Sequence, residues 1–101
     1  MIEIKSKVLP ISCICSIYIN TDLKELIIAI DSLLMQEYTP NEIVIIVDGI
    51  IKKNIKPFLD FIADNKSLFK IYYLKRNIGL GLALNYGIKK CRNKLLSLIH
   101  I

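Results

Sequence analysis

The sequence lacks any apolar run long enough to cross a lipid bilayer, which takes about 18 to 20 consecutive apolar residues. Its apolar residues come in short blocks separated by Lys, Asn, Asp and Pro. The opening segment, MIEIKSK, has no apolar stretch followed by a small-residue cleavage site, as a secretory signal would have. We therefore expect a cytoplasmic domain.

Cysteine and histidine are scarce, with three cysteines and one histidine. An odd number of cysteines fits neither a disulfide framework nor a complete zinc site. Cys13 and Cys15 alternate within an apolar segment, where cysteine acts as a small apolar residue. We expect these thiols to be neither crosslinked nor metal ligands.

Charge of one sign is not concentrated anywhere, although the formal net charge is +5. The lysines are spread along the chain, apart from the pairs Lys52/Lys53 and Lys89/Lys90. Aromatic residues are not interleaved with them, as they are in a platform that stacks nucleic-acid bases. We expect no nucleic-acid partner.

Apolar residues make up 53% of the 101 residues and charged residues 23%, which predicts a packed core rather than disorder. Apolar segments typical of strands alternate with segments of helical periodicity. Strands are expected at 11–18, 42–47, 70–74 and from 95. Helices are expected to begin at Thr21 or Asp22, near Pro57 and after Gly81. This alternation predicts a Rossmann-like α/β fold, a right-handed parallel sheet with flanking helices.

Such a sheet binds ligands at the carboxyl ends of its strands. Segments 16–20, 48–49 and 77–81 should therefore form the functional rim. Asp48 stands out as a strand-end carboxylate followed by Gly49. An Asp-Gly pair is also common turn chemistry, so a purely structural role for Asp48 remains open.

Four segments, in order, resemble family 2 glycosyltransferases of the GT-A fold. They are the strand end at Tyr18 and the stretches SLLMQ (32–36), EIVIIVDG (42–49) and LKRNIGLGLALNYGI (74–88). The resemblance covers residues 11–95 and is nearest to bacterial enzymes that build surface polysaccharide or lipopolysaccharide. It implies an incomplete, N-terminal part of an enzyme that transfers sugar from a nucleotide-diphosphate sugar to a glycan or lipid-linked acceptor.

The resemblance also implies the binding residues. Tyr18 would pack against the donor's base, Ser16 and Ile17 would line the same loop, and Asp48 would accept a hydrogen bond from the ring N–H. The loop beside the nucleoside would contain Asn77, Gly79 and Gly81.

One departure concerns the residue before Asp48. Many family members carry two acidic residues before the glycine, whereas the first of these positions is Val47 here. The base is therefore left undecided, and the donor is expected to be a UDP- or GDP-sugar.

The resemblance implies a divalent cation, Mg²⁺ or Mn²⁺, in the full-length enzyme. That metal needs an Asp-x-Asp motif after the fourth strand, and inverting members need a further carboxylate base. Neither occurs in this sequence, and His100, near the first metal position, does not replace two oxygen ligands. We expect this chain to bind no metal and to be inactive alone. Attachment of the full-length protein to the inner face of the membrane stays open.

The last six residues, Leu96 to Ile101, are what the nucleotide string CTGTCTCTTATACACATC encodes, the mosaic end of a sequencing transposon. Our hypothesis is that 96–101 is adapter-encoded and that the natural reading frame was lost near Leu95. Residues 1–101 are thus expected to be a single incomplete domain.

Two other interpretations remain open. Gly79-Leu80-Gly81 could indicate a dinucleotide-binding, Rossmann-type oxidoreductase, but Leu84 stands at the third glycine position and the motif follows the third strand, not the first. The chain could also be a non-catalytic α/β binding domain.

Overall fold

The computed structural model describes residues 7–99. Strands and helices alternate along them: β1 (Lys7–Ile17), α1 (Leu23–Leu34), β2 (Tyr38–Asp48), α2 (Ile55–Ile62), β3 (Phe69–Leu74), α3 (Leu80–Lys90) and β4 (Leu95–Ile99). The strands pair in parallel in the order β3-β2-β1-β4. The predicted Rossmann-like parallel sheet with flanking helices is confirmed. Within residues 7–99, no helix has the length and apolarity to cross a membrane.

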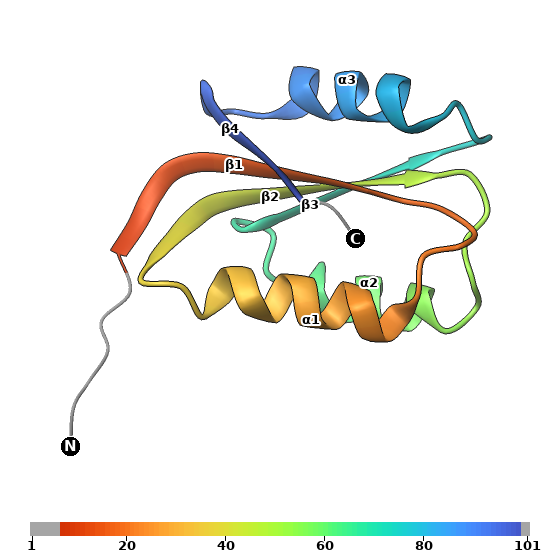
Figure 1. Cartoon of the computed structure of the whole chain (residues 1–101), viewed down its shortest axis with the longest axis horizontal. Coiled ribbons are helices and arrows are strands. Elements are labelled where there is room, and N and C mark those ends of the chain that lie inside the picture. The colour runs from red at the N-terminus through yellow and green to blue at the C-terminus, as the bar shows by residue number, and fades with distance from the viewer. Residues whose placement is uncertain (1–6, 100–101) are drawn as a thin grey trace.

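The helices cover opposite faces of the sheet: α1 and α2 pack on one face, and α3 lies on the other (Figure 1). From β1 the chain moves outward to β2 and β3, and α3 then carries it back across the sheet to β4 on the other side of β1. The direction of winding therefore reverses between β1 and β4. In open α/β sheets, ligands bind in the crevice at such a reversal.

The two central strands, β1 and β2, are buried on both faces, which explains why their sequences show no polar–apolar alternation. The larger core cluster lies between the sheet and α1 and α2, and the smaller one beneath α3. The helix α3 approaches the sheet closely at Gly87, where an added Cβ would lie 2.7 Å from Cγ2 of Ile14.

β2 begins earlier than the sequence pattern suggested, at Tyr38 rather than at residue 42, and includes Pro40. Proline cannot donate to a neighbouring strand, so it interrupts regular pairing. The register between β1 and β2 shifts between Leu9 and Ser12, beside Pro10. This irregularity lets both strands run through their prolines, and the predicted start at 42 is therefore wrong.

A buried polar cluster ties the connection between α3 and β4 to the amino-terminal half of the sheet. The Glu42 carboxylate accepts from the Ser12 hydroxyl at 2.8 Å and from the backbone N–H of Arg92 at 2.9 Å. The Asn93 side-chain amide donates to the Ser12 hydroxyl at 2.9 Å. These bonds satisfy polar groups that would be costly to bury alone.

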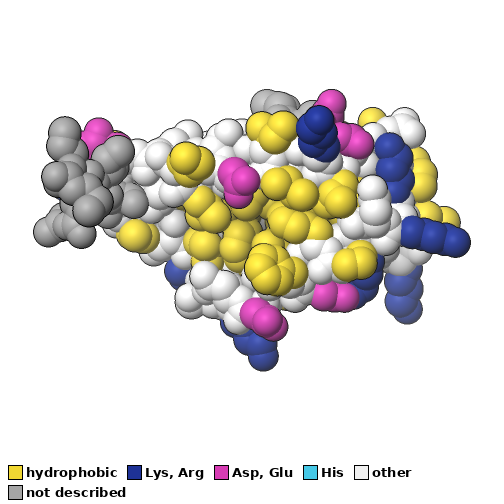
Figure 2. Space-filling view, turned by 90° about the horizontal axis from the view of Figure 1, so that it is seen from below, with side chains coloured by type: hydrophobic (Ala, Val, Ile, Leu, Met, Phe, Trp, Pro, Cys, Tyr) yellow, Lys and Arg dark blue, Asp and Glu magenta, His cyan; other side chains and the backbone are white. Residues whose placement is uncertain are grey.

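The outer face of the α1 and α2 layer carries gathered apolar side chains (Figure 2). A shallow groove runs between the two helices, and Phe61, which lines it, is 76% exposed. Asp31 and Asp64 also line the groove. The layer thus buries one face against the sheet and leaves apolar surface on the other.

Candidate nucleotide-binding site

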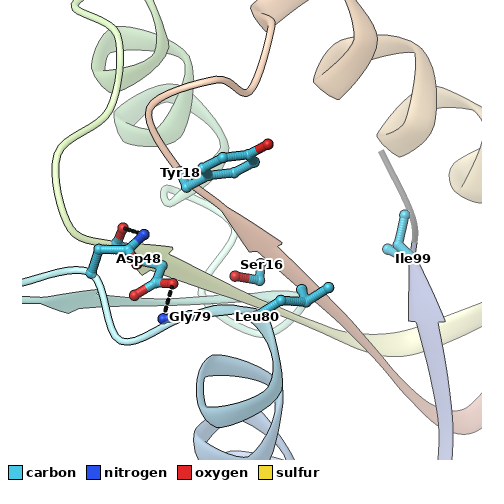
Figure 3. A pocket seen from close by; sticks show the side chains of 7 residues that line it. Ser16, Tyr18, Asp48, Gly79, Leu80 and Ile99 are labelled. Atoms are coloured by element: carbon cyan, nitrogen blue, oxygen red, sulfur yellow. Dashed lines mark hydrogen bonds between the residues drawn. The ribbon is translucent and has the colours of Figure 1, made fainter.

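A cavity of about 390 Å³ lies at the carboxyl ends of the strands, where β1 and β4 are neighbours (Figure 3). Pockets of about 300 to 1,000 Å³ are typical of small-molecule sites. Its lining residues are Ser16, Tyr18, Asp48, Asn77, Gly79, Leu80 and Ile99. The cavity therefore occupies the place at which this topology is expected to bind a ligand.

Tyr18 is held by a tight turn that follows β1. Its backbone N–H donates to the Thr21 hydroxyl at 3.0 Å, and its carbonyl accepts from the Thr21 N–H at 3.0 Å. Asp22 then caps α1 by accepting from the backbone N–H of Glu25 at 3.3 Å. The Tyr18 side chain remains 44% exposed, so its ring offers an apolar face to the cavity.

Asp48 ends β2 with its carboxylate directed at the loop between β3 and α3. Oδ1 accepts from the backbone N–H of Ile78 at 2.7 Å, and Oδ2 accepts from that of Gly79 at 3.1 Å. The residue is only 2% exposed. Both carboxylate oxygens are therefore engaged by the protein itself.

The backbone next to Asp48 meets the same loop. The Asn77 side-chain amide donates to the Asp48 carbonyl at 3.2 Å. Gly49 has a φ of 84°, and a Cβ at this position would lie 2.7 Å from the backbone nitrogen of Asn77. Only glycine combines this conformation with so close an approach.

The structure brings five of the residues implied by the family resemblance around this cavity: Ser16, Tyr18, Asp48, Asn77 and Gly79. Two others do not line it.

The Ile17 side chain is fully buried in the larger core cluster, because adjacent residues of a strand point to opposite faces. Gly81 lies in the first turn of α3, and a Cβ built there would meet no atom within 4 Å. Side-chain contact of Ile17 with a ligand is therefore not available in this structure.

Two further residues line the cavity: Leu80, which lies within the predicted rim segment 77–81 but was not predicted to bind, and Ile99, which lies outside the predicted rim. Leu80 begins α3 and is 60% exposed, and its position directly after Gly79 is the signal that could have identified it. Ile99 belongs to the stretch interpreted as adapter-encoded, and we give it no role in binding.

Potential metal ligands do not converge within the described residues: no group of three or more His, Cys, Asp or Glu side chains could hold a metal ion there. His100 lies outside the described residues. The described residues therefore provide no ligand set for the divalent cation that the family resemblance implies.

The thiols are poorly suited to reactivity at neutral pH. Burial raises the pKa of the Cys15 thiol to about 12, and burial also raises the pKa of Cys13 and of Cys91. Because the thiolate is the nucleophile and the metal ligand, these cysteines act as neutral side chains.

The profile of the family described as "Glycosyl transferase family 2" matches residues 12–100, which include every residue around the cavity. The chain therefore belongs to the family 2 glycosyltransferases. This membership favours the transferase interpretation over a dinucleotide-dependent oxidoreductase or a non-catalytic binding domain.

Among characterised proteins, the chain is similar to the UDP-Gal:alpha-D-GlcNAc-diphosphoundecaprenol beta-1,3-galactosyltransferase of Escherichia coli. The two are 31% identical over 84 residues, which is 83% of this chain and 30% of that enzyme. The chain thus spans about a third of the length of this relative. No solved structure matches the chain.

Proposed function

We propose that this chain is the nucleotide-binding part of a glycosyltransferase that moves sugar from a nucleotide-diphosphate sugar to a glycan or lipid-linked acceptor in surface polysaccharide synthesis. The observation that carries the proposal is the cavity at the carboxyl ends of β1 and β2, which lies inside the segment matched to the family. The nucleotide of the donor is its proposed occupant.

The cavity offers groups suited to a nucleoside. A base is flat and apolar on its faces, and the half-exposed ring of Tyr18 can pack against one of them. Ser16 supplies a hydroxyl that can both donate and accept, and Asn77 supplies an amide. Gly79 has a φ of 91° and no side chain, so a ligand can approach its backbone closely.

The name of the galactosyltransferase supports the choice of donor and acceptor, since that enzyme takes UDP-galactose and a sugar on diphosphoundecaprenol. We propose a UDP-sugar in preference to a GDP-sugar, and a lipid-linked acceptor. A lipid-linked acceptor would place the full-length enzyme at the membrane surface, and we propose peripheral attachment at its cytoplasmic face.

Catalysis would require groups outside the described residues. We propose that the divalent cation of the full-length enzyme is held by residues beyond this chain, together with the base that deprotonates the acceptor hydroxyl. The chain alone should therefore bind donor nucleotide weakly and transfer no sugar.

Saturation-transfer NMR with UDP, GDP and NAD tests the binding step. We expect signal transfer from the protein to UDP, weakened by Tyr18→Ala. Binding of NAD with no response to UDP or GDP would overturn the proposal, as would sugar transfer by the chain alone.

A further inference from the structure

We propose that Asp48 is a positioning residue, which shapes the cavity by fixing the loop of Asn77, Ile78 and Gly79 and does not itself bond the base. This inference rests on the proposed function of the cavity as a nucleotide site. It gives Asp48 a different role from the direct base contact that the family resemblance implies.

The Asp48 carboxylate already has its hydrogen-bond partners within the protein. Two consecutive backbone N–H groups, of Ile78 and Gly79, donate to its two oxygens at 2.7 and 3.1 Å. Hydrogen bonds to an ionised acceptor are shorter and stronger than neutral ones. With 2% of Asp48 exposed, little acceptor surface is left for a ligand in the cavity.

The end of β2 and this loop meet through three separate contacts. Besides the carboxylate bonds, the Asn77 side chain donates back to the Asp48 carbonyl at 3.2 Å. Gly49 lies so near the Asn77 backbone that a methyl group would not fit between them. A residue that served only to contact a ligand would not need this surrounding fit.

Asp48 also contacts the start of α3. Its N-cap, Gly79, has no side chain to accept a hydrogen bond from the first turn. The Asp48 carboxylate places negative charge at this helix end, which favours the orientation of the helix dipole. Asp48 therefore sets the position of Gly79 and Leu80, which form part of the cavity wall.

Isothermal titration of UDP, GDP and CDP into wild type, Asp48→Asn and Gly49→Ala tests the assignment. Uracil and guanine carry a ring N–H that could donate a hydrogen bond to a carboxylate. The corresponding ring nitrogen of cytosine has no hydrogen and acts as an acceptor. Asp48→Asn keeps one acceptor but turns an NH₂ group toward a loop N–H, and Gly49→Ala pushes the loop away while keeping the carboxylate.

If Asp48 positions the loop, each variant should raise the Kd of every nucleotide that wild type binds, and within one variant the factor should be the same for all of them. For Asp48→Asn the expected factor is about tenfold, because a charge-assisted hydrogen bond is lost. The proposal is overturned if Asp48→Asn raises the Kd for UDP or GDP while sparing CDP, or if Gly49→Ala leaves binding unchanged. Asp60→Asn is the matched control, because Asp60 is exposed on α2 and pairs with Lys56.

A readout without ligand separates this inference from the proposed function. Amide hydrogen exchange at Ile78 and Gly79 should be faster in Asp48→Asn and Gly49→Ala than in wild type or Asp60→Asn. Unchanged exchange at both amides overturns the positioning role. Failure of wild type to bind any of the nucleotides would instead overturn the proposed function.

Discussion

The backbone N–H of Ile78 donates to Oδ1 of Asp48 over 2.7 Å, joining the end of β2 to a loop 30 residues further along the chain. The neighbouring N–H of Gly79 donates to the other oxygen of the same carboxylate. One buried side chain thereby sets the path of the chain from β3 into α3, along the wall of the candidate nucleotide site.

Replacement of Tyr18 by Ala should weaken UDP binding about two- to tenfold, since an aromatic stacking contact contributes about 0.5 to 1.5 kcal/mol. Tyr18→Phe should bind nearly as wild type, because the ring face is retained. Isothermal titration of the three proteins measures the effect. Equal loss in Tyr18→Ala and Tyr18→Phe would show that the hydroxyl, not the ring, makes the contact.

Gly87→Ala should lower the free energy of unfolding by about 1 to 3 kcal/mol, because its Cβ would press against Ile14 at 2.7 Å. Gly81→Ala is the matched control in the same helix, where the added methyl meets nothing within 4 Å. That control should be neutral or more stable by up to about 1 kcal/mol. Urea unfolding of both variants compares them, and equal effects would contradict the close packing of α3.

Ser12→Ala should destabilise the fold by about 1 to 3 kcal/mol, since it removes one donor from the buried Glu42 carboxylate and one acceptor from Asn93. Ser67→Ala removes a hydroxyl whose bond to Asn65 is exposed, and should change stability by less than about 0.5 kcal/mol. Thermal unfolding followed by circular dichroism checks the pair. A smaller loss of stability in Ser12→Ala than in Ser67→Ala would contradict a stabilising role for the buried cluster of Ser12, Glu42 and Asn93.

Stability should fall as the pH rises above 9, the ordinary pKa of a cysteine thiol, toward the value of about 12 that burial gives Cys15. In this window the unfolded chain releases the proton while the folded chain retains it, so the folded state binds more protons and loses stability with rising pH. The loss approaches about 1.4 kcal/mol per pH unit for one such thiol. Urea unfolding of wild type and Cys15→Val between pH 8 and about 11 isolates this contribution; parallel curves would contradict it.

Phe61→Ser should reduce the binding of a hydrophobic dye and slow aggregation, because Phe61 is 76% exposed in the apolar groove between α1 and α2. Nucleotide affinity should not change, since the groove lies on the layer of α1 and α2, which covers the opposite face of the sheet from α3. Dye fluorescence and light scattering provide the measurement. Unchanged values for both would show that this surface does not govern solubility.

The sequence predicted the order of elements and the parallel sheet because each strand is a compact apolar block and each helix keeps its own period. β4 begins at residue 95, as the pattern predicted, although on the adapter hypothesis its residues from Leu96 onward form a strand partly by accident. The start of β2 could not be predicted, because the tolerance of Pro40 depends on an irregular register with β1, a neighbour distant in sequence.

Local pattern also failed to assign side chains to a face in doubly buried strands. Ile17 and Val47 both lie in the larger core cluster, whereas Ser16 and Asp48 line the cavity. When both faces are apolar, no alternation distinguishes them. The carboxylate contacts of Asp48 were equally hidden, because they depend on the path of a loop that only the folded chain defines.

The most direct test of the account is a titration of the ¹⁵N-labelled chain with UDP, followed by amide chemical shifts. We expect saturable shifts at Ser16, Tyr18 and Gly79, with amides of α2 such as that of Leu59 unmoved. Shifts confined to surfaces away from the β1–β4 reversal, or no shifts at millimolar UDP, would contradict it.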